Sequence, residues 1–269
     1  MESPPATYTH GHHESVLRSH RWRTVENSAA YLMADLEPGL SLLDVGSGPG
    51  TITADLAHRL SPGRVTAMEA NAEALQLTRD EIQAQGLTNV DLLVGDVHEL
   101  EFADDSFDIV HAHQVLQHVA DPVRALQEMR RVCRPGGVVA ARDADYAAFT
   151  WFPAVPGLDE WLDLYERVAR SNGGEPDAGR RMHVWAREAG FEQVTATAST
   201  WCYNTPDDRA WWGGMWADRV LQSAMTRQVL DEGLASQADL ERMSAAWTTW
   251  AEDEDGWIAI LHGEILCRV

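Results

Sequence analysis

The sequence predicts an α/β fold with a doubly wound, mainly parallel sheet in its first half and a mostly helical segment in its second. Short apolar runs, typical of strands buried on both faces, alternate with amphipathic stretches over the first 150 residues. The first predicted strand runs directly into a turn with three glycines. The composition then changes, because ten of the eleven tryptophans lie at or after Trp151. One large domain with an insertion accounts for all three observations.

The chain begins with a segment that is predicted to be helical. Residues 14–36 have apolar side chains at helical spacing, among them Trp22, Ala29 and Leu32. We expect one or two helices here, packed against the sheet that follows. Residues 1–38 are therefore predicted to form a helical unit ahead of the core.

Residues 39–150 alternate strand and helix with short connections, which is the pattern of a doubly wound sheet. Helices are expected over residues 51–60, 72–85 and 122–134. Five apolar runs are predicted to form the strands: 41–45, 65–69, 90–94, 107–112 and 138–142.

Residues 151–269 are predicted to complete the core around an insertion. Pro153, Pro156 and Gly157 interrupt the chain, and helices are expected over 158–170 and 180–189. Two further strands are expected over 194–203 and 257–269. The helical stretch between them is too long for a hairpin loop, so residues 205–253 are predicted to form a helical cap inserted into the core.

The charged residues exclude several kinds of function. The 269 residues include 42 acids and 21 arginines but no lysine, which gives a net charge of −21. Without lysine, the chain cannot form a Schiff base, anchor pyridoxal phosphate or build a Walker-A phosphate site. The acidic excess disfavours nucleic acids and anionic membranes as partners, because both are bound through clustered cations.

Cysteine and histidine patterns give no sign of a metal site. Cys133, Cys202 and Cys267 are widely spaced and form no zinc or disulfide pattern. The histidines of His10–His13 lack companion ligands at metal-binding spacing, so we expect no metal. The sequence has no secretory leader and no long apolar run, which predicts a cytoplasmic protein.

The glycine-rich turn is the strongest signal for a ligand. Asp44 lies near the end of the first predicted strand, two residues before Gly46, and Gly48 and Gly50 follow before the next helix. Glycines at this position let the backbone turn tightly and approach a nucleoside at the carboxyl end of the sheet. The third glycine comes one residue too early for the dinucleotide fingerprint, and Thr51 stands in its place, which disfavours a nicotinamide-dependent oxidoreductase.

The turn and the strand ends after it resemble class I S-adenosylmethionine-dependent methyltransferases. Residues 42–51 (LLDVGSGPGT) are similar to the family's first motif, and Glu69 and Gly95–Val97 end the next two strands as its acidic positions do. Residues 111–121 (HAHQVLQHVAD) and 126–137 (LQEMRRVCRPGG) lie where the family has its fourth motif and the turn before its fifth strand. The spacings are close to those of quinone-biosynthesis (UbiE-like) enzymes, which implies a Rossmann-like sheet of the seven-stranded methyltransferase type.

The resemblance implies that S-adenosyl-L-methionine is the cofactor and S-adenosyl-L-homocysteine its product. Gly46, Gly48 and Gly50 would approach its methionine and ribose parts, and Glu69 would bind the ribose hydroxyls. Asp44 would organise the loop, although it could instead only cap the following helix.

The rest of the implied cofactor site lies further along the chain. Asp96 and Val97 would contact the adenine, unless Asp96 is simply a surface turn residue. The backbone at His113 would meet the methionine end. The first 38 residues would act as a lid in which Tyr8 or Arg23 binds the methionine carboxylate, with a surface role for Arg23 as the alternative.

Methyl transfer from a sulfonium depends mainly on alignment, so a catalytic base is not obligatory. If the acceptor must lose a proton, polar side chains after the fourth and fifth strands are the candidates. Packing and cofactor positioning are the alternative roles for each of them. The candidate catalytic residues are His113, His118, Asp145 and Tyr146.

The tryptophans of the second half suggest the acceptor, although they could instead form the cap's own core. Clustered indoles suit a small, largely apolar or aromatic metabolite that is methylated on carbon, oxygen or nitrogen. Quinone or secondary metabolism is the expected setting, and the protein is expected to be a monomer or a homodimer. A cofactor-binding protein without methyl transfer, either cyclase-like or regulatory, is the alternative.

Overall fold

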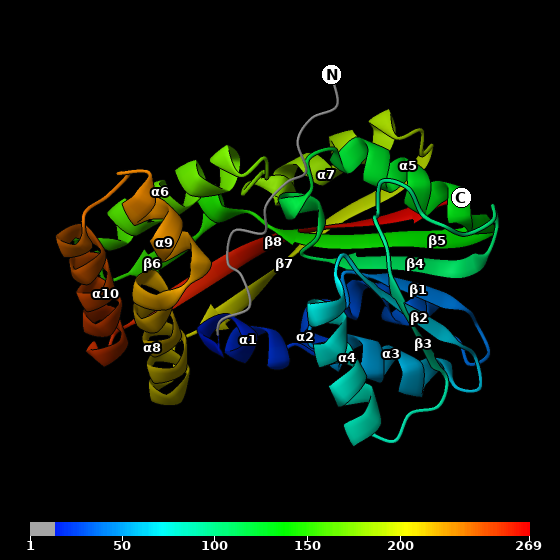
Figure 1. Ribbon diagram of the computed structural model, residues 1–269, viewed down its shortest axis with the longest axis horizontal. Helices are drawn as coiled ribbons and strands as arrows, with labels where there is room; N and C mark the ends of the chain where they lie inside the picture. Colours follow the sequence, from blue (N-terminus) through cyan, green and yellow to red (C-terminus); the bar gives the residue numbers. More distant parts are fainter. Residues whose placement is uncertain (1–13) are drawn as a thin grey trace.

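The computed structural model describes residues 14–269, and one mixed sheet runs through them (Figure 1). The strand order is β3-β2-β1-β4-β5-β8-β6, and β7 pairs with β8. The expected doubly wound, Rossmann-like sheet is confirmed. The strands are β1 (Leu42–Val45), β2 (Val65–Glu69), β3 (Val90–Val94), β4 (Phe107–His113), β5 (Cys133–Ala144), β6 (Thr150–Phe152), β7 (Gln193–Tyr203) and β8 (Trp257–Arg268).

Strands β1 to β5 are parallel neighbours, so the loops that follow them meet at one edge of the sheet. Helices α3 (Thr51–Leu60) and α4 (Ala72–Ala84) lie on one side of it, and α5 (Pro122–Val132) and α7 (Ala178–Glu188) lie on the other (Figure 1). Short polar side chains cap the N-termini of α4 and α5: Asn71 accepts the Ala74 N–H, and Asp121 accepts the Arg124 N–H.

Two strands, β5 and β6, differ from the sequence prediction by more than one residue at an end. Strand β5 begins at Cys133 rather than residue 138, because Cys133 pairs with Phe107 ahead of the register shift between Phe107 and Ile109. The Arg134–Gly137 segment had the composition of a turn, yet it is part of the strand. Strand β6 was not predicted at all, since its three residues are too few for a periodic pattern; it pairs with the start of β8.

The leading segment contains two short α-helices and a 3-10 helix: α1 (Glu14–Arg21), α2 (Val25–Ser28) and η1 (Ala30–Asp35). Trp22, between α1 and α2, packs edge-on against Trp201 and Tyr203 of β7, with ring centroids 5.4 and 5.6 Å apart. The indole N–H of Trp201 donates to the carbonyl of Asn27 at 2.7 Å. These contacts hold the leading segment against β7, a strand that is far away in the sequence.

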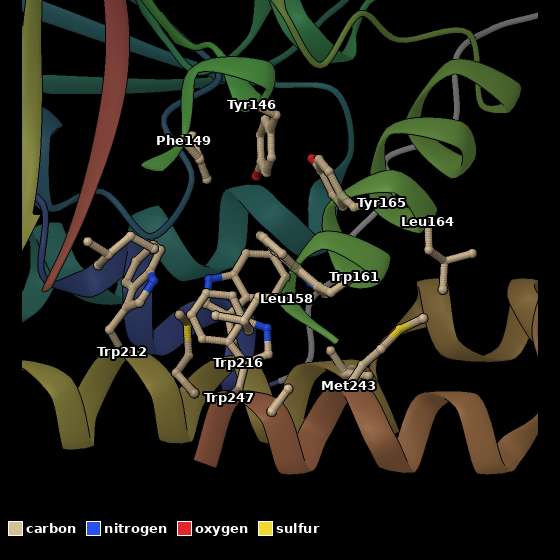
Figure 2. Close-up of a cluster of buried hydrophobic side chains, with 14 of the residues drawn as sticks. Tyr146, Phe149, Leu158, Trp161, Leu164, Tyr165, Trp212, Trp216, Met243 and Trp247 are labelled. Carbon is tan, nitrogen blue, oxygen red and sulfur yellow. The ribbon is translucent and has the colours of Figure 1, made fainter. Parts of the chain in front are cut away.

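Helices α8 (Pro206–Gln222), α9 (Ala224–Asp231) and α10 (Gln237–Glu252) connect β7 to β8 and stand apart from the parallel half of the sheet, beside α6 (Leu158–Ser171) (Figure 1). We call α8, α9 and α10 the cap. Its core is aromatic: the Trp161 ring meets those of Trp216 and Trp247 edge to face, at 4.5 and 4.8 Å between centroids (Figure 2).

Some of the second-half tryptophans therefore do form the cap's own core, as the alternative interpretation held. Trp161, Trp247 and Trp250 are fully buried there. Within the described residues, no helix has the length and apolar character needed to span a membrane.

Candidate active site

The loop between β1 and α3 has three glycines with positive φ, at +71° for Gly46, +57° for Gly48 and +86° for Gly50. A Cβ on Gly46 would lie 2.5 Å from a Val115 methyl, and one on Gly50 would lie 2.9 Å from the Cα of Thr78. A Cβ on Gly48 would meet no atom of the described part of the chain within 4 Å. Gly46 and Gly50 thus allow close packing, whereas Gly48 supplies a left-handed backbone beside open space.

Asp44 lies beneath this loop and is 3% exposed. One carboxylate oxygen accepts the Thr53 hydroxyl at 2.6 Å, and the other lies 2.8 Å from His111 Nδ1. The side chain therefore ties β1 to α3 and to β4. This arrangement supports the loop from below and leaves Asp44 without a surface that a ligand could reach.

Glu69 lies at the carboxyl end of β2, next to the glycine loop. Its Oε1 accepts the Gly48 N–H at 2.6 Å, and its Oε2 accepts the Ala70 N–H at 3.1 Å. These backbone donors hold the carboxylate in a fixed orientation beside Gly48. The structure thus brings Glu69 and the loop together, as the strand order requires.

Asp96 follows β3, the neighbour of β2, and its side chain is 68% exposed. Burial raises the pKa of Asp96, but hydrogen bonds from the His98 backbone and imidazole outweigh it, so the pKa lies below its usual value. Val97 is buried in the core beside it. Two anionic side chains at adjacent strand ends and an open glycine fit a nucleoside with hydroxyl and amino donors.

Gln114 connects the glycine-loop side of the site to the second half of the chain. It directly follows β4 with a φ of +54°. Its side-chain oxygen accepts from Arg23 Nη2 at 2.7 Å, and its amide nitrogen donates to His262 Nε2 at 2.9 Å. Arg23 also lies over the Trp201 ring, 5.5 Å from the centroid. A single side chain thus links the leading segment, β4 and β8.

Beyond Gln114 lies a small cavity of about 40 Å³, between the leading segment, the ends of β4 and β5, and the cap helix α8. Its wall combines indole, phenol and phenyl rings with two arginines. The lining residues are Ser19, His20, Arg23, Gln114, His118, Ala144, Tyr146, Phe149, Trp201, Trp212, Trp216, Arg219 and Ile260.

Two of the four candidate catalytic residues, His118 and Tyr146, line this cavity. Asp145 does not, and its carboxylate accepts three bonds from Arg180: Nε at 2.7 Å, Nη2 at 2.5 Å and the backbone N–H at 3.0 Å. A carboxylate bonded in this way positions the start of α7. His113 is buried behind the wall, stacked on His262 with ring centroids 6.5 Å apart.

Both cavity candidates are held uncharged. Burial lowers the pKa of His118 to about 3, and the positive charge of Arg23 adds to the effect. Burial raises the pKa of Tyr146, and this effect is larger than the lowering effects of Tyr165 and of the arginines. Burial likewise places the pKa of His113 well below its ordinary value. Tyr146 is therefore a hydrogen-bond donor, and His118 is a weak base.

Tyr8 lies outside the described residues. Arg23 does lie at the junction of the cavity and the strand ends, although sequence alone did not show that Gln114 would hold it.

Comparison with known proteins identifies the family. Residues 36–197 match the family described as a methyltransferase domain. An uncharacterised methyltransferase of Schizosaccharomyces pombe is 33% identical over 97% of this chain and 96% of its own length. The chain belongs to the methyltransferase family. Both comparisons identify it as a methyltransferase.

Two further comparisons bear on this methyltransferase. The ubiquinone/menaquinone biosynthesis C-methyltransferase UbiE of Shewanella piezotolerans is 30% identical over 66% of this chain and 74% of its own. Phosphoethanolamine N-methyltransferase 2 of Haemonchus contortus, solved with S-adenosylhomocysteine, has a TM-score of 0.57 at 16% identity, covering 89% of this chain and 52% of that one. The second comparison shows the shared fold.

Sequence reasoning missed two side chains of the methyltransferase's cavity. Gln114 could have been found, since it directly follows a strand whose carboxyl end faces the site. Arg219 gave no signal, because an arginine on a predicted helix resembles any surface cation. Only the fold shows that α8 turns it inward, where it is 4% exposed.

Proposed function

We propose that this methyltransferase transfers its methyl group to a small, largely apolar or aromatic metabolite held in the aromatic cavity. The observation that carries the proposal is the cavity's wall, which five aromatic side chains share: Tyr146, Phe149, Trp201, Trp212 and Trp216. Aromatic walls with a few polar groups are typical of sites for small aromatic ligands. The similarity to UbiE supports a setting in quinone or secondary metabolism.

The cofactor would bind along the carboxyl ends of β1 to β4. In this proposal Glu69 accepts the ribose hydroxyls, and the bond from the Gly48 N–H pre-orients its carboxylate. Asp96 accepts the adenine amino group, and Val97 supports the ring. Gly46, Gly48 and Gly50 let the backbone approach.

Arg23 would bind the methionine carboxylate, because it lies at the junction between the strand ends and the cavity. Gln114 fixes the guanidinium from one side and Trp201 supports it from another. Asp44 acts indirectly, since one of its oxygens is bonded to Thr53 and the other to His111, and both contacts support the glycine loop.

S-adenosylmethionine supplies an activated methyl group on a sulfonium. The chain's own residues then have to hold the acceptor in line and exclude water, and alignment of this kind can contribute about 7–11 kcal/mol. The rings of the cavity perform both tasks. Tyr146 donates a hydrogen bond to an oxygen or nitrogen of the methyl acceptor. Because His118 is a weak base, proton abstraction contributes little to the reaction. Acceptors whose nucleophilic lone pair is already exposed are therefore favoured.

Calorimetry with S-adenosylmethionine and S-adenosylhomocysteine, followed by incubation with a methyl-labelled cofactor and a panel of small quinols, phenols and aromatic amines and acids, tests the proposal. We expect both cofactor forms to bind and the label to move to at least one aromatic compound. If neither form binds, the site described above is wrong. Binding without label transfer to any compound would favour the cyclase-like or regulatory alternative.

The acidic surface supports a small molecule rather than a nucleic acid as acceptor, because a net charge of −21 repels polyanions. Adding tRNA or DNA to the labelled reaction should leave the nucleic acid unlabelled. Size-exclusion chromatography with light scattering would distinguish the monomer from the homodimer.

A further inference from the structure

Three strands of the sheet pair with a single neighbour within residues 14–269: β3, β6 and β7. Such edge strands present backbone N–H and C=O groups on which another chain can add a strand, and short length, proline and charge protect them. Strand β6 has three residues and is followed directly by Pro153. Strand β3 has five residues and carries Asp91, which forms an ion pair with Arg64 at 2.5 Å. Two of the three edges are therefore protected.

Strand β7 has none of these protective features. It is eleven residues long and keeps one antiparallel register with β8 from Gln193 to Tyr203. Its sequence, QVTATASTWCY, contains no charged residue and no proline, in a chain of which 23% of the residues are charged. Valine and threonine favour extended backbone. Strand β7 is thus a long, regular and uncharged edge.

The outer edge of β7 is accessible along its middle. Four successive residues, 195–198, are exposed, and their side chains alternate between the two faces of the sheet. The leading segment packs on Trp201 and Tyr203, beyond this stretch. Within residues 14–269, no backbone hydrogen bond joins β7 to a segment other than β8. The groups that point away from β8 are thus available to a further strand.

The two faces of β7 are distinct. Thr197 and Ser199 both donate to the Glu264 carboxylate, Thr197 at 2.8 Å, so the odd-numbered residues share one face. Val194 packs on the other face, in the core that includes Met182 of α7. A second strand must match these faces, because a slip of one residue would exchange them.

A second copy of β7 meets this requirement. When two identical strands pair antiparallel about a two-fold axis, each face continues the same face of the other copy if the axis passes through a residue. An axis at Thr197, within the exposed stretch, places Ala196 opposite the partner's Ala198. Small side chains then meet beside the axis, so the backbones can approach without a clash.

The charge of the protein also favours a second copy as the occupant of this edge. The net charge is −21, so most of the surface of one copy repels the surface of another. At β7 two copies can meet without bringing acidic strands together. A basic partner, by contrast, would be drawn to the acids elsewhere on the surface and would gain no charge attraction at an uncharged strand.

We propose that this methyltransferase forms a homodimer in which β7 of one copy pairs antiparallel with β7 of the other, with the two-fold axis at Thr197. Residues 194–200 of each copy supply the hydrogen bonds between them. The two eight-stranded sheets thereby become one continuous sheet. Strands β5 and β8 separate β7 from β1 to β4, so pairing leaves the proposed cofactor site of each copy open.

Sedimentation velocity of the full chain over a concentration series tests the proposal without any variant. We expect twice the monomer mass of 29.8 kDa, falling to the monomer mass on dilution. Added salt should tighten the dimer, because it screens the repulsion between two acidic proteins. A monomer at every concentration would overturn the proposal. A dimer that salt dissociates would also overturn it, since ion pairs would then hold the two copies together.

Amide hydrogen exchange then locates the interface. The amides of residues 194–200 should exchange more slowly in a concentrated sample than in a dilute one, whereas those of β3 should exchange equally in both. A dimer that forms without protecting residues 194–200 would place the interface elsewhere and refute the proposal. Slow exchange at every concentration in a monomer would show that another segment of the same chain covers this edge, which refutes it equally.

A charge added to the open edge should break the dimer. Ala196→Glu should weaken association by at least about tenfold, because two added carboxylates then lie near the axis on the same face. Ala84→Glu, the same change at an exposed position of α4, should leave association unchanged. Thermal unfolding checks that both variants fold. Unchanged association in a folded Ala196→Glu protein would contradict the assignment to β7. None of these readouts depends on methyl transfer.

Discussion

The parallel half of the sheet and the cap half place different side chains around the candidate site. At the ends of β2 and β3, Glu69 and Asp96 present negative charge and accept hydrogen bonds from backbone donors. The cavity under the cap is lined mainly by aromatic rings, among them Tyr146, Trp212 and Trp216. The first half is built from local turns, and the second from residues brought together by long-range packing.

This difference indicates that the two halves can be altered independently. Substitutions at the strand ends should change cofactor affinity and leave stability largely intact. Substitutions in the cap core should change stability and leave cofactor affinity largely intact. The four predictions below test this separation.

The largest effect is expected for Trp247→Ala in the cap core. Trp247 is fully buried between Trp161 and Trp216. Its removal should cost about 3–5 kcal/mol of stability, measured by urea unfolding, because of lost burial and a remaining void. Trp257→Ala, which removes the same side chain from a site that is 37% exposed, should cost far less. A large loss of S-adenosylhomocysteine affinity in folded Trp247→Ala protein would break the separation.

Glu69→Ala should weaken cofactor binding by about 1.5–3 kcal/mol, roughly ten- to hundredfold, because a charged acceptor is lost. Its unfolding midpoint should change little. Asp96→Ala should have a smaller effect, since that side chain is more exposed to water. Glu73→Ala, an exposed acid in the first turn of α4, is the control and should bind normally. Unchanged calorimetric affinity in both Glu69→Ala and Asp96→Ala would remove the proposed nucleoside contacts.

Asp143 lies at the end of β5, where the two halves meet. Its burial leads us to expect an effect of pH on stability. It is fully buried, and one oxygen accepts the Gln117 N–H at 3.0 Å. The other oxygen has no hydrogen-bond partner within residues 14–269. Burial raises its pKa to about 7, against the lowering effects of the Gln117 and Leu116 N–H groups. The folded protein thus keeps this proton at pH values where the unfolded chain has lost it, and the resulting stability is lost as the pH rises through about 7.

Asn cannot ionise, so Asp143→Asn should be more stable than the unmodified protein at pH 8, by about 1–3 kcal/mol, the cost of an unsatisfied buried polar group. The advantage should shrink toward pH 5. Thermal unfolding at both pH values checks this, and a difference that is the same at pH 5 and pH 8 would contradict the assigned titration.

The smallest effect is expected for Gly48→Ala. An alanine would add no clash, but a left-handed backbone costs a non-glycine residue about 1–2 kcal/mol. Gly86→Ala is the matched control, since Gly86 also has a positive φ, +66°, and open space around it. Both variants should lose similar stability, and only Gly48→Ala should bind S-adenosylhomocysteine more weakly. Equal affinities in the two would argue that Gly48 does not lie against the cofactor.

The predictability of the two halves from sequence follows from how each is built. The bounds of β2, β3 and α3 match the predicted ranges, because each element has its own apolar periodicity and its own turn residues. Glu69 and Asp96 could be placed at neighbouring strand ends because parallel strands end at the same edge. The sequence carries this information locally, within a few residues of each position.

The acceptor cavity could not be predicted in the same way. Gln114 and Arg219 become neighbours of one cavity only when β4, α1 and α8 pack together. The ion pair of Asp145 with Arg180 is likewise a tertiary contact that no local spacing reveals. Tryptophan content indicated an aromatic region, yet it could not separate the rings that line the cavity from those that fill the cap core.

Strand β8 gives the protein a particular order of assembly. Of the described strands it is the last in the sequence, yet it lies inside the sheet, paired with β5 and β6 on one side and with β7 on the other. During synthesis on the ribosome, the edges of β5 and β7 therefore stay open until residues 257–268 have emerged. Open edges of this kind invite wrong pairing with other chains. Early termination of translation before β8 should consequently yield aggregates rather than a working cofactor-binding fragment.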